Sequence, residues 1–260
     1  MLGALDWQPY PHVHLRALDA VNLPAHWAAL HAGDAEPLPS DPDLLSAWAL
    51  FHRGEFEAAF HAGRLLGHAG VTVANKACLI HADFLEPSET TRLKLYCDTA
   101  ERALRQINHD PHNPNAHYFY GYALGRYSQG TSVAQALAQG HGEKIKKAFE
   151  TAIALQALHA DAHLALGTFH AEVIDKVGAM IGNITYGAHP DVAIRHFRAG
   201  MALIPHAPLA LSEYARGLLM LDPEAHEAEA MELYARAAAV NPRDAMEHLG
   251  VLQIQAELAD

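Results

Sequence analysis

The residues best suited to chemistry lie in the stretch FHAEVIDKVGAMIGNITYGAHPDVAIRHF, from Phe169 to Phe197. Five polar side chains in this stretch lie among hydrophobic ones: Glu172, Asp175, Lys176, Asn183 and Tyr186. On one helix over 161–186 they would form a polar stripe opposite an apolar one. Such a stripe suits a small polar ligand or a peptide. The alternative is a solvated surface that carries Glu172 and Lys176 as an i,i+4 pair.

The apolar side of this expected helix contains six large side chains: Phe169, Val173, Val177, Met180, Ile181 and Ile184. Two glycines interrupt the pattern, Gly178 and Gly182. Glycine in a helix interior costs about 1 kcal/mol relative to alanine. We therefore interpret the pair as a kink or as a close crossing with a neighbouring helix.

A tyrosine-rich segment, HYFYGYALGRY, is the second candidate. Tyr118 and Tyr122 are four residues apart and therefore share one face of a helix. Rings on this face could line a concave surface, since tyrosine offers apolar area with a hydroxyl at its tip. The alternative is that single rings fill gaps between helices.

The chain contains 20 histidines, which raises the question of metal binding. His159, His163 and His170 would share a face if all three were helical, and this spacing can chelate a divalent ion. However, His159 occupies an expected turn between helices, and no compact set of three or four ligands stands out. We expect no metal and no cofactor. His163 and His170 remain candidates for contacts with a ligand or partner.

Common catalytic motifs are absent: the sequence has no GxSxG, HExxH, GxxxxGK[ST] or GxGxxG signature. The serine in GRYSQG lacks the spacing of a nucleophile, and nothing identifies a base for Cys97. Two cysteines do not suggest a disulfide scaffold either. We therefore expect a protein that is not an enzyme.

The elements that must position the candidate residues are repeated helix pairs. AHYFYG, from 116, and AHLALG, from 162, begin with alanine and carry glycine five residues later, and ALSEYA and AMEHLG keep small residues at both places. AIRHFRAGMALIP and AMELYARAAAVNP place two small residues seven apart, followed by proline. Seven residues make about two helical turns, so the small residues share one face that a neighbouring helix can approach. The proline then ends the helix.

These residues resemble the tetratricopeptide repeat over roughly 41–260, and Gly54, Phe56 and Ala59 in FHRGEFEAAFHAGRLL supply a further match. The resemblance implies an all-α fold, a right-handed superhelical array of antiparallel helix pairs (an α-solenoid). It also implies binding of a partner on the concave surface. The phrase TYGAHPDVAIRHFRAGMAL is similar to the T-component of certain bacterial (TRAP) substrate transporters and to the regulator-of-microtubule-dynamics family.

Repeat spacing is uneven: successive first helices start 46, 48 and 35 residues apart, from Ala116 to Ala245. Two middle repeats therefore carry about a dozen extra residues each, one in Arg126–Gly142 and one in the opening stretch. We predict helices at 24–30, 43–53, 55–67, 71–85, 89–108, 114–129, 142–157, 161–186, 190–204, 208–221, 225–240 and 244–258. Residues 1–40 are expected to form an extension that packs on the first repeat, and 41–260 the repeat domain.

The formal net charge of −12 disfavours binding to nucleic acid. The basic cluster of Lys144, Lys146 and Lys147 is interpreted as a solvated helix face.

No uncharged run reaches the roughly 18 residues needed to cross a bilayer, so membrane insertion is not expected. The N-terminus lacks the features of a signal peptide. We expect a cytoplasmic protein, although an exported chain without its leader would look the same.

Together these observations predict a non-enzymatic scaffold or adaptor that binds a partner protein or peptide on its concave surface. The alternative is a small-molecule or metal-binding module associated with transport. An open groove would favour the adaptor, and a closed pocket walled by the two insertions would favour the small-molecule module. The sequence leaves homo-oligomers open. The candidate binding residues are Tyr118, Tyr122, His163, His170, Glu172, Asp175, Asn183 and Tyr186.

Overall fold

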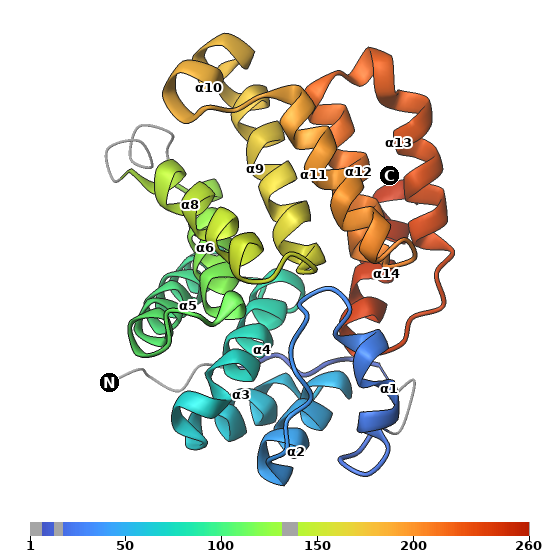
Figure 1. Ribbon diagram of the computed structural model, residues 1–260. Coiled ribbons are helices and arrows are strands. Elements are labelled where there is room, and N and C mark those ends of the chain that lie inside the picture. Colours follow the sequence, from blue (N-terminus) through green and yellow to red (C-terminus); the bar gives the residue numbers. More distant parts are fainter. Residues whose placement is uncertain (1–6, 13–17, 132–139, 260) are drawn as a thin grey trace.

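The computed structural model describes residues 7–12, 18–131 and 140–259 (Figure 1). In these ranges it contains thirteen α-helices, one 3₁₀ turn and no strand, which confirms the predicted all-α class. The first half holds α1 (Leu23–Leu30), α2 (Pro42–His52), α3 (Phe56–Leu65), η1 (Gly67–Gly70), α4 (Val71–Phe84), α5 (Glu89–His109) and α6 (Pro114–Gln129). The second half holds α8 (His141–Leu155), α9 (Ala160–Val177), α10 (Ala179–Tyr186), α11 (Pro190–Leu203), α12 (Pro208–Leu221), α13 (Pro223–Ala238) and α14 (Ala245–Ala259).

Local sequence signals set most helix starts. Proline occupies the first turn of α2, α6, α11, α12 and α13, where its missing N–H costs nothing. Side chains that accept a hydrogen bond from a backbone N–H cap α2, α5, α6 and α13; these are Asp41, Ser88, Asn113 and Asp222. His159 caps α9 in the same way through its imidazole. The expected position of His159 in the turn before this helix is thus confirmed.

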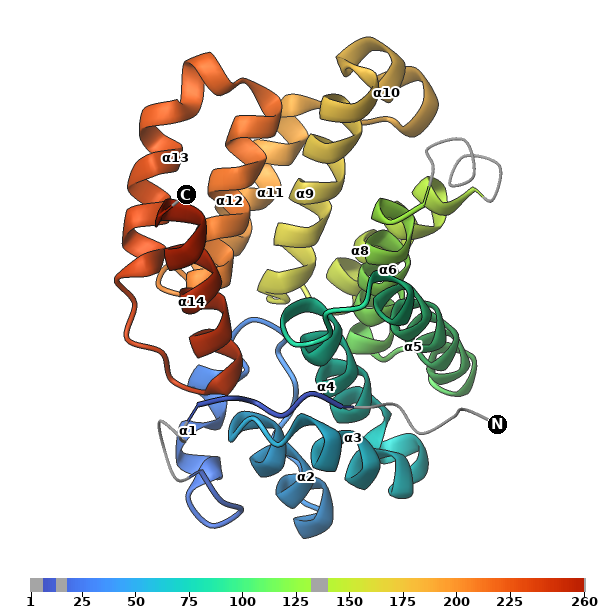
Figure 2. The same cartoon turned by 180° about the vertical axis from the view of Figure 1, so that it is seen from behind.

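From α2 to α14 most successive helices pack against one another, and α10 and α11 both pack on α9 (Figures 1 and 2). A second set of contacts joins alternate helices: α4 touches α6, α6 touches α9, α9 touches α12, and α12 touches α14. The last helix, α14, also contacts α2 and α4. The inner helices therefore meet in a ring, and the beginning and end of the described chain lie side by side.

Small residues permit the close helix crossings, as their spacing predicts. Gly200 packs on α9, where an added Cβ would lie 2.7 Å from Cγ of Leu164. A Cβ at Gly217 would overlap the ring of Phe197, which lies fully buried between α9 and α12. The other residues of the seven-residue pattern, Ala193, Ala230 and Ala237, are also fully buried.

The predicted long helix over 161–186 is wrong. α9 ends at Val177, and Gly178 adopts φ +80° and ψ 154°, which a residue with a side chain rarely accepts. A separate helix, α10, follows. Its Met180, Ile181 and Ile184 are 74%, 53% and 81% exposed and so do not continue the buried stripe of α9.

Candidate ligand-binding pocket

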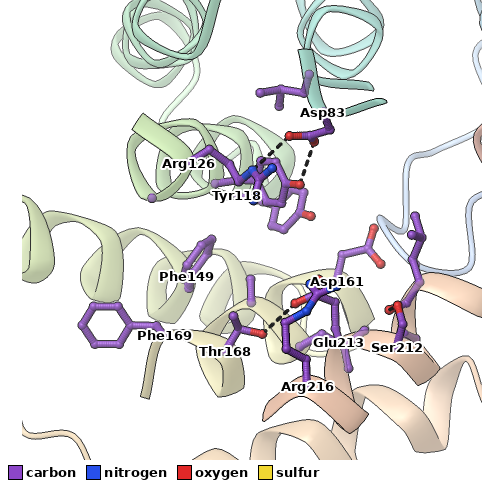
Figure 3. A pocket seen from close by; sticks show the side chains of 18 of the residues that line it. Asp83, Tyr118, Arg126, Phe149, Asp161, Thr168, Phe169, Ser212, Glu213 and Arg216 are labelled. Carbon is purple, nitrogen blue, oxygen red and sulfur yellow. Dashed lines mark hydrogen bonds and ion pairs between the residues drawn. The ribbon is translucent and has the colours of Figure 1, made fainter. Parts of the chain in front are cut away.

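A cavity of about 520 Å³ occupies the centre of the ring (Figure 3). The inner helices α4, α6, α9, α12 and α14 line it, together with α8 and the segment after α1. The first expected insertion contributes Arg126, Ser128, Gln129, His141 and Gly142, although its residues 132–139 lie outside the described part of the chain. The second contributes Phe169, Glu172, Val173, Lys176, Val177 and Tyr186. The volume is in the range of small-molecule sites, about 300–1,000 Å³.

One wall of the pocket is aromatic. The ring centroids of Tyr118 and Tyr122 on α6 are 5.9 Å apart, and Phe149 of α8 lies 6.1 Å from Tyr118. Phe169 and Tyr186 extend this wall, with their rings 6.5 Å apart in an edge-on arrangement. Across the cavity, aliphatic side chains of α4, α9 and α14 complete an apolar lining: Leu79, Ile80, Leu164 and Ile254. The pocket therefore suits a ligand with an apolar body.

Asp83 fixes the polar side of this aromatic wall. Its carboxylate accepts hydrogen bonds from the hydroxyls of Tyr96 (2.7 Å) and Tyr122 (2.8 Å) and from Nε of Arg126 (3.0 Å). Burial, followed by the charge of Asp83, raises the pKa of Tyr122 well above its usual value, so its hydroxyl keeps the proton that it donates. The three donors hold this carboxylate in one orientation.

Glu213 of α12 forms a second fixed group on the opposite side (Figure 3). It accepts hydrogen bonds from Oγ1 of Thr168 (3.2 Å) and from Nη1 of Arg216 (2.8 Å). Glu172 of α9 accepts a hydrogen bond from the amide of Gln129. Burial raises the pKa of Glu172, while Lys176 opposes this shift. Charge is thus distributed around the cavity and does not collect on one wall.

Each cation that lines the pocket has a carboxylate partner among the described residues. The pairs are Lys76–Asp34, Arg126–Asp83, Lys176–Glu172, Arg216–Glu213 and Arg243–Glu247. One lining carboxylate is left over. Asp161 has no ion pair or hydrogen bond to its side chain within the described ranges, and neither has the hydroxyl of Tyr118. Burial raises the pKa of Asp161 to about 6, which leaves it ionised at neutral pH.

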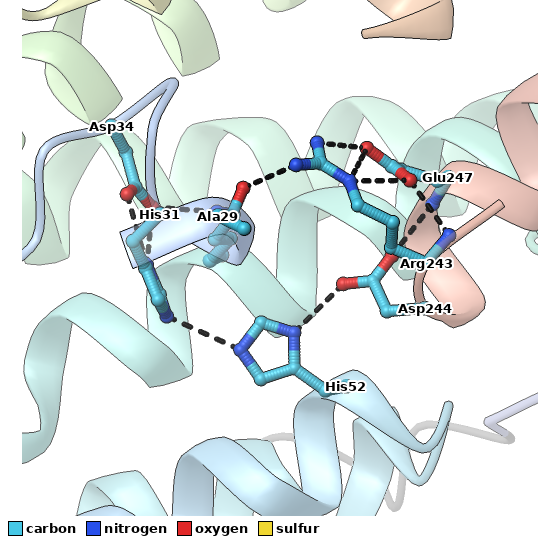
Figure 4. Close-up of polar contacts among 8 residues, drawn as sticks. Ala29, His31, Asp34, His52, Arg243, Asp244 and Glu247 are labelled. Carbon is cyan, nitrogen blue, oxygen red and sulfur yellow. Dashed lines mark hydrogen bonds and ion pairs between the residues drawn. The ribbon is translucent and has the colours of Figure 1, made fainter. Parts of the chain in front are cut away.

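A buried polar cluster closes the ring beside this pocket (Figure 4). Nδ1 of His31 lies 2.9 Å from Asp34, the two Nε2 atoms of His31 and His52 are 3.2 Å apart, and Nδ1 of His52 lies 2.7 Å from Asp244. His52 and Asp244 are 192 residues apart in the chain. Arg243 adds a hydrogen bond of 2.5 Å to the carbonyl of Ala29. The segment after α1, α2 and the start of α14 are held together by side chains.

The protons in this cluster can be counted. Three hydrogen bonds connect two carboxylates and two imidazoles, and each bond holds one proton. Burial lowers the pKa of His31 to about 4, so this ring is neutral at pH 7.

A second polar chain ties the N-terminal segment to α6 and α9. Glu36 accepts a hydrogen bond of 2.6 Å from the amide of Asn115, whose carbonyl lies 3.0 Å from Nε2 of His159. Burial, followed by the charge of Asp34, raises the pKa of Glu36 to about 8. Burial also lowers the pKa of His159 to about 4. At neutral pH both groups are therefore mainly uncharged.

Glu36→Gln should make unfolding less dependent on pH. The raised pKa of Glu36 stabilises the fold below its unfolded value of 4.5, and this contribution is lost as pH rises through about 8. Between pH 5 and 9 the unfolding free energy of the wild type should fall by about 2 kcal/mol relative to the variant, allowing for partial exposure. Denaturant titrations at both pH values measure this. Glu57→Gln, at a carboxylate that is 58% exposed, is the matched control. If the free energies of unfolding of the wild type and Glu36→Gln differed by the same amount at pH 5 and pH 9, the raised pKa of Glu36 would be contradicted.

The structure brings together four of the eight residues predicted to bind a partner. Tyr118, Tyr122, Glu172 and Tyr186 line the pocket. The other four lie elsewhere. His163 stacks on His196, with their Nδ1 atoms 3.0 Å apart, and His170 is 2% exposed and accepts a hydrogen bond from the backbone N–H of His189. Asp175 lies on α9 but is exposed outside the pocket, and Asn183 is exposed on α10 because the break at Gly178 ends the helix on which the two were expected to align.

Sequence reasoning missed most of the charged residues of the pocket: Asp34, Lys76, Asp83, Arg126, Asp161, Glu213 and Arg216. Lys76, Asp83, Arg126, Glu213 and Arg216 lie in helices that contain only one or two Asp, Glu, Lys or Arg residues, and this pattern was a usable signal. Among the described residues, no three His, Cys, Asp or Glu side chains are arranged to hold a metal ion. No helix in the same ranges has the length and apolar character that crossing a membrane requires.

Comparison with known proteins gives one family similarity. The family described as regulator of microtubule dynamics protein 1-3 matches residues 71–198, which include α4 to most of α11. This supports the second resemblance seen in the sequence. The matched part contains Lys76, Tyr118, Tyr122, Asp161 and Glu172 of the pocket. A search of curated proteins found no match.

Proposed function

We propose that the chain is a non-enzymatic binding module that holds a small ligand in its central pocket. The scaffold for this function is a tetratricopeptide-like, right-handed superhelical array of antiparallel helix pairs whose ends meet. The observation that carries the proposal is the pocket of about 520 Å³, walled by both insertions and by the inner helices. The pocket is partly open to solvent, and its walls from both insertions favour a small-molecule module over an adaptor with an extended groove.

Gly125 is a further observation in favour of a ligand. It lies inside α6 and lines the pocket, and a Cβ placed on it would have no atom of the described residues within 4 Å. Glycine at such a position destabilises a helix by about 0.5–1 kcal/mol relative to alanine, without any crossing that requires it. The missing side chain leaves room in the cavity, which a ligand can fill.

The polar groups of the pocket support recognition by a fixed pattern of charges. Asp83 is held by three donors and Glu213 by two. Preorganised groups of this kind orient a ligand, since they need no rearrangement when it binds.

A protein or peptide partner is the second proposal. The exposed Met180, Ile181 and Ile184 on α10 favour it, because clustered apolar side chains on a surface mark interaction sites.

Filling the pocket tests the first proposal. The neutral apolar dye N-phenyl-1-naphthylamine should bind the wild type with one site per chain and gain fluorescence. Gly125→Trp should lower its affinity at least tenfold, since the indole would occupy the space beside α6. Ala58→Trp, at an exposed position of α3, should leave the affinity unchanged. Equal binding to all three proteins, or to none, would contradict a ligand pocket and leave the partner proposal.

A further inference from the structure

Asp161 lines the pocket but takes part in none of the ion pairs described above. It lies in the first turn of α9, and its backbone N–H donates a 3.0 Å hydrogen bond to the carbonyl of Gly33. Its carboxylate rests against the bare Cα of Gly33, where an added Cβ would overlap Oδ1. The N-terminal segment thus holds the side chain in place at the cavity wall (Figure 3).

The charges around Asp161 leave it without a counter-ion. The cation whose charge acts on Asp161, Lys76, is already bound to Asp34 at a distance of 2.5 Å. Asp34 and Asp161 therefore face a single ammonium group, and this end of the pocket carries one net negative charge. The four other cations that line the cavity among the described residues are bound to their own carboxylates. An anionic ligand would have to displace one of those pairs, whereas a cationic ligand would not.

The aromatic wall adds to the preference for a cation. Tyr118 presents its hydroxyl and ring beside Asp161, and its ring is close to those of Tyr122 and Phe149. Burial, followed by the charge of Asp161, raises the pKa of Tyr118 well above its usual value, so the hydroxyl stays protonated. Aromatic faces attract ammonium groups through the ring quadrupole, and more strongly when water is excluded.

We propose that the ligand carries a protonated amine on an apolar body, with the ammonium paired to Asp161 and the body packed on Tyr118, Tyr122 and Phe149. This rests on the proposed function of the pocket and names its ligand class. The amine supplies the counter-ion that the chain does not provide. The volume of about 520 Å³ limits the body to a small organic amine or the amino end of a short peptide.

Three probes that share a phenylethyl group separate the charge from the apolar body: 2-phenylethylamine, 2-phenylethanol and 3-phenylpropanoate. Calorimetric or NMR titration of the full chain at pH 7.5 should show the amine binding at least tenfold tighter than the alcohol, and the carboxylate weakest. Asp161→Asn should reduce the affinity for the amine to that for the alcohol and leave the alcohol unchanged. Asp175→Asn, at an exposed carboxylate on the same helix, is the matched control and should keep the wild-type order.

A second variant covers the case in which Asp161→Asn fails to fold. Gly33→Ala places a methyl group where the carboxylate rests, and should also remove the preference for the amine. Equal affinity of the wild type for amine and alcohol, or a preference that survives in both variants, overturns the inference and leaves the pocket function standing. No binding of any probe, together with failure of the dye to bind, overturns the pocket function itself.

Discussion

Lys76→Met should lower the free energy of unfolding by about 3–5 kcal/mol, because it leaves a buried carboxylate without its cation. Nζ of Lys76 lies 2.5 Å from Oδ2 of Asp34, and the two side chains are 8% and 0% exposed. Methionine keeps the apolar stem and removes the ammonium group, whose Nζ lies 5.8 Å and 5.4 Å from the ring centroids of Trp48 and Phe51. Urea unfolding followed by circular dichroism measures the loss.

Two controls test whether the buried pair is the cause. The double variant Lys76→Met with Asp34→Asn should recover part of the loss, since it removes both charges. Lys94→Met should cost less than about 1 kcal/mol, because the pair of Lys94 with Asp98 has the same i,i+4 spacing as other surface pairs and Lys94 is 53% exposed. Equal costs at Lys76 and Lys94 would show that the pair contributes no more than a surface contact.

Phe197→Ala should destabilise the fold by about 3–5 kcal/mol, the range for deleting a buried aromatic ring. Phe197 is fully buried, stacks on Tyr214 with centroids 5.3 Å apart, and fills the space beside two glycines, Gly167 and Gly217. The glycines have no side chains that could move into the cavity, so it should persist. Thermal and urea unfolding give the change.

Ile184→Ala is the matched control for Phe197→Ala. It also removes a large apolar side chain from a helix, but that side chain is 81% exposed on α10. We expect a change within about 0.5 kcal/mol, as for most surface substitutions. A loss of several kcal/mol at Ile184 would contradict the placement of α10 outside the core.

Helix bounds could be predicted from the sequence because their signals are local. Proline and capping side chains set the starts, and the apolar period of 3.6 residues gives the lengths. The expected helix over 190–204 is observed as Pro190–Leu203, and that over 71–85 as Val71–Phe84. The failure at 161–186 has a local cause too. Glycine at position 178 could mean a kink or a close crossing, and only the backbone angle identifies it as a break.

The pocket could be predicted only in part. Tyr118 and Tyr122 were found because their spacing places them on one face, and Glu172 and Tyr186 because they lie in an insertion. Contacts between distant segments determine the rest. Asp161 is exposed to the cavity through its fit against Gly33, and sequence spacing contains no information about a neighbour 128 residues away.

The N-terminal segment shows the same limit. It was expected to pack on the first repeat. Trp7 does lie against Phe60 of α3, with centroids 5.2 Å apart, but the segment also reaches the far end of the chain. The hydroxyl of Tyr10 lies 2.6 Å from Nδ1 of His248 in α14. Closure of the ring depends on such pairs, which no repeat pattern encodes.

Native mass spectrometry of the purified chain tests the central claim, that the pocket at the centre of the ring is a ligand site, most directly. Under gentle desorption the wild type should retain one small-molecule adduct per chain, and Gly125→Trp should appear as the bare polypeptide. Ala58→Trp, prepared in the same way, should retain the adduct. An adduct of equal abundance on all three proteins, or bare polypeptide for all three, would contradict the account.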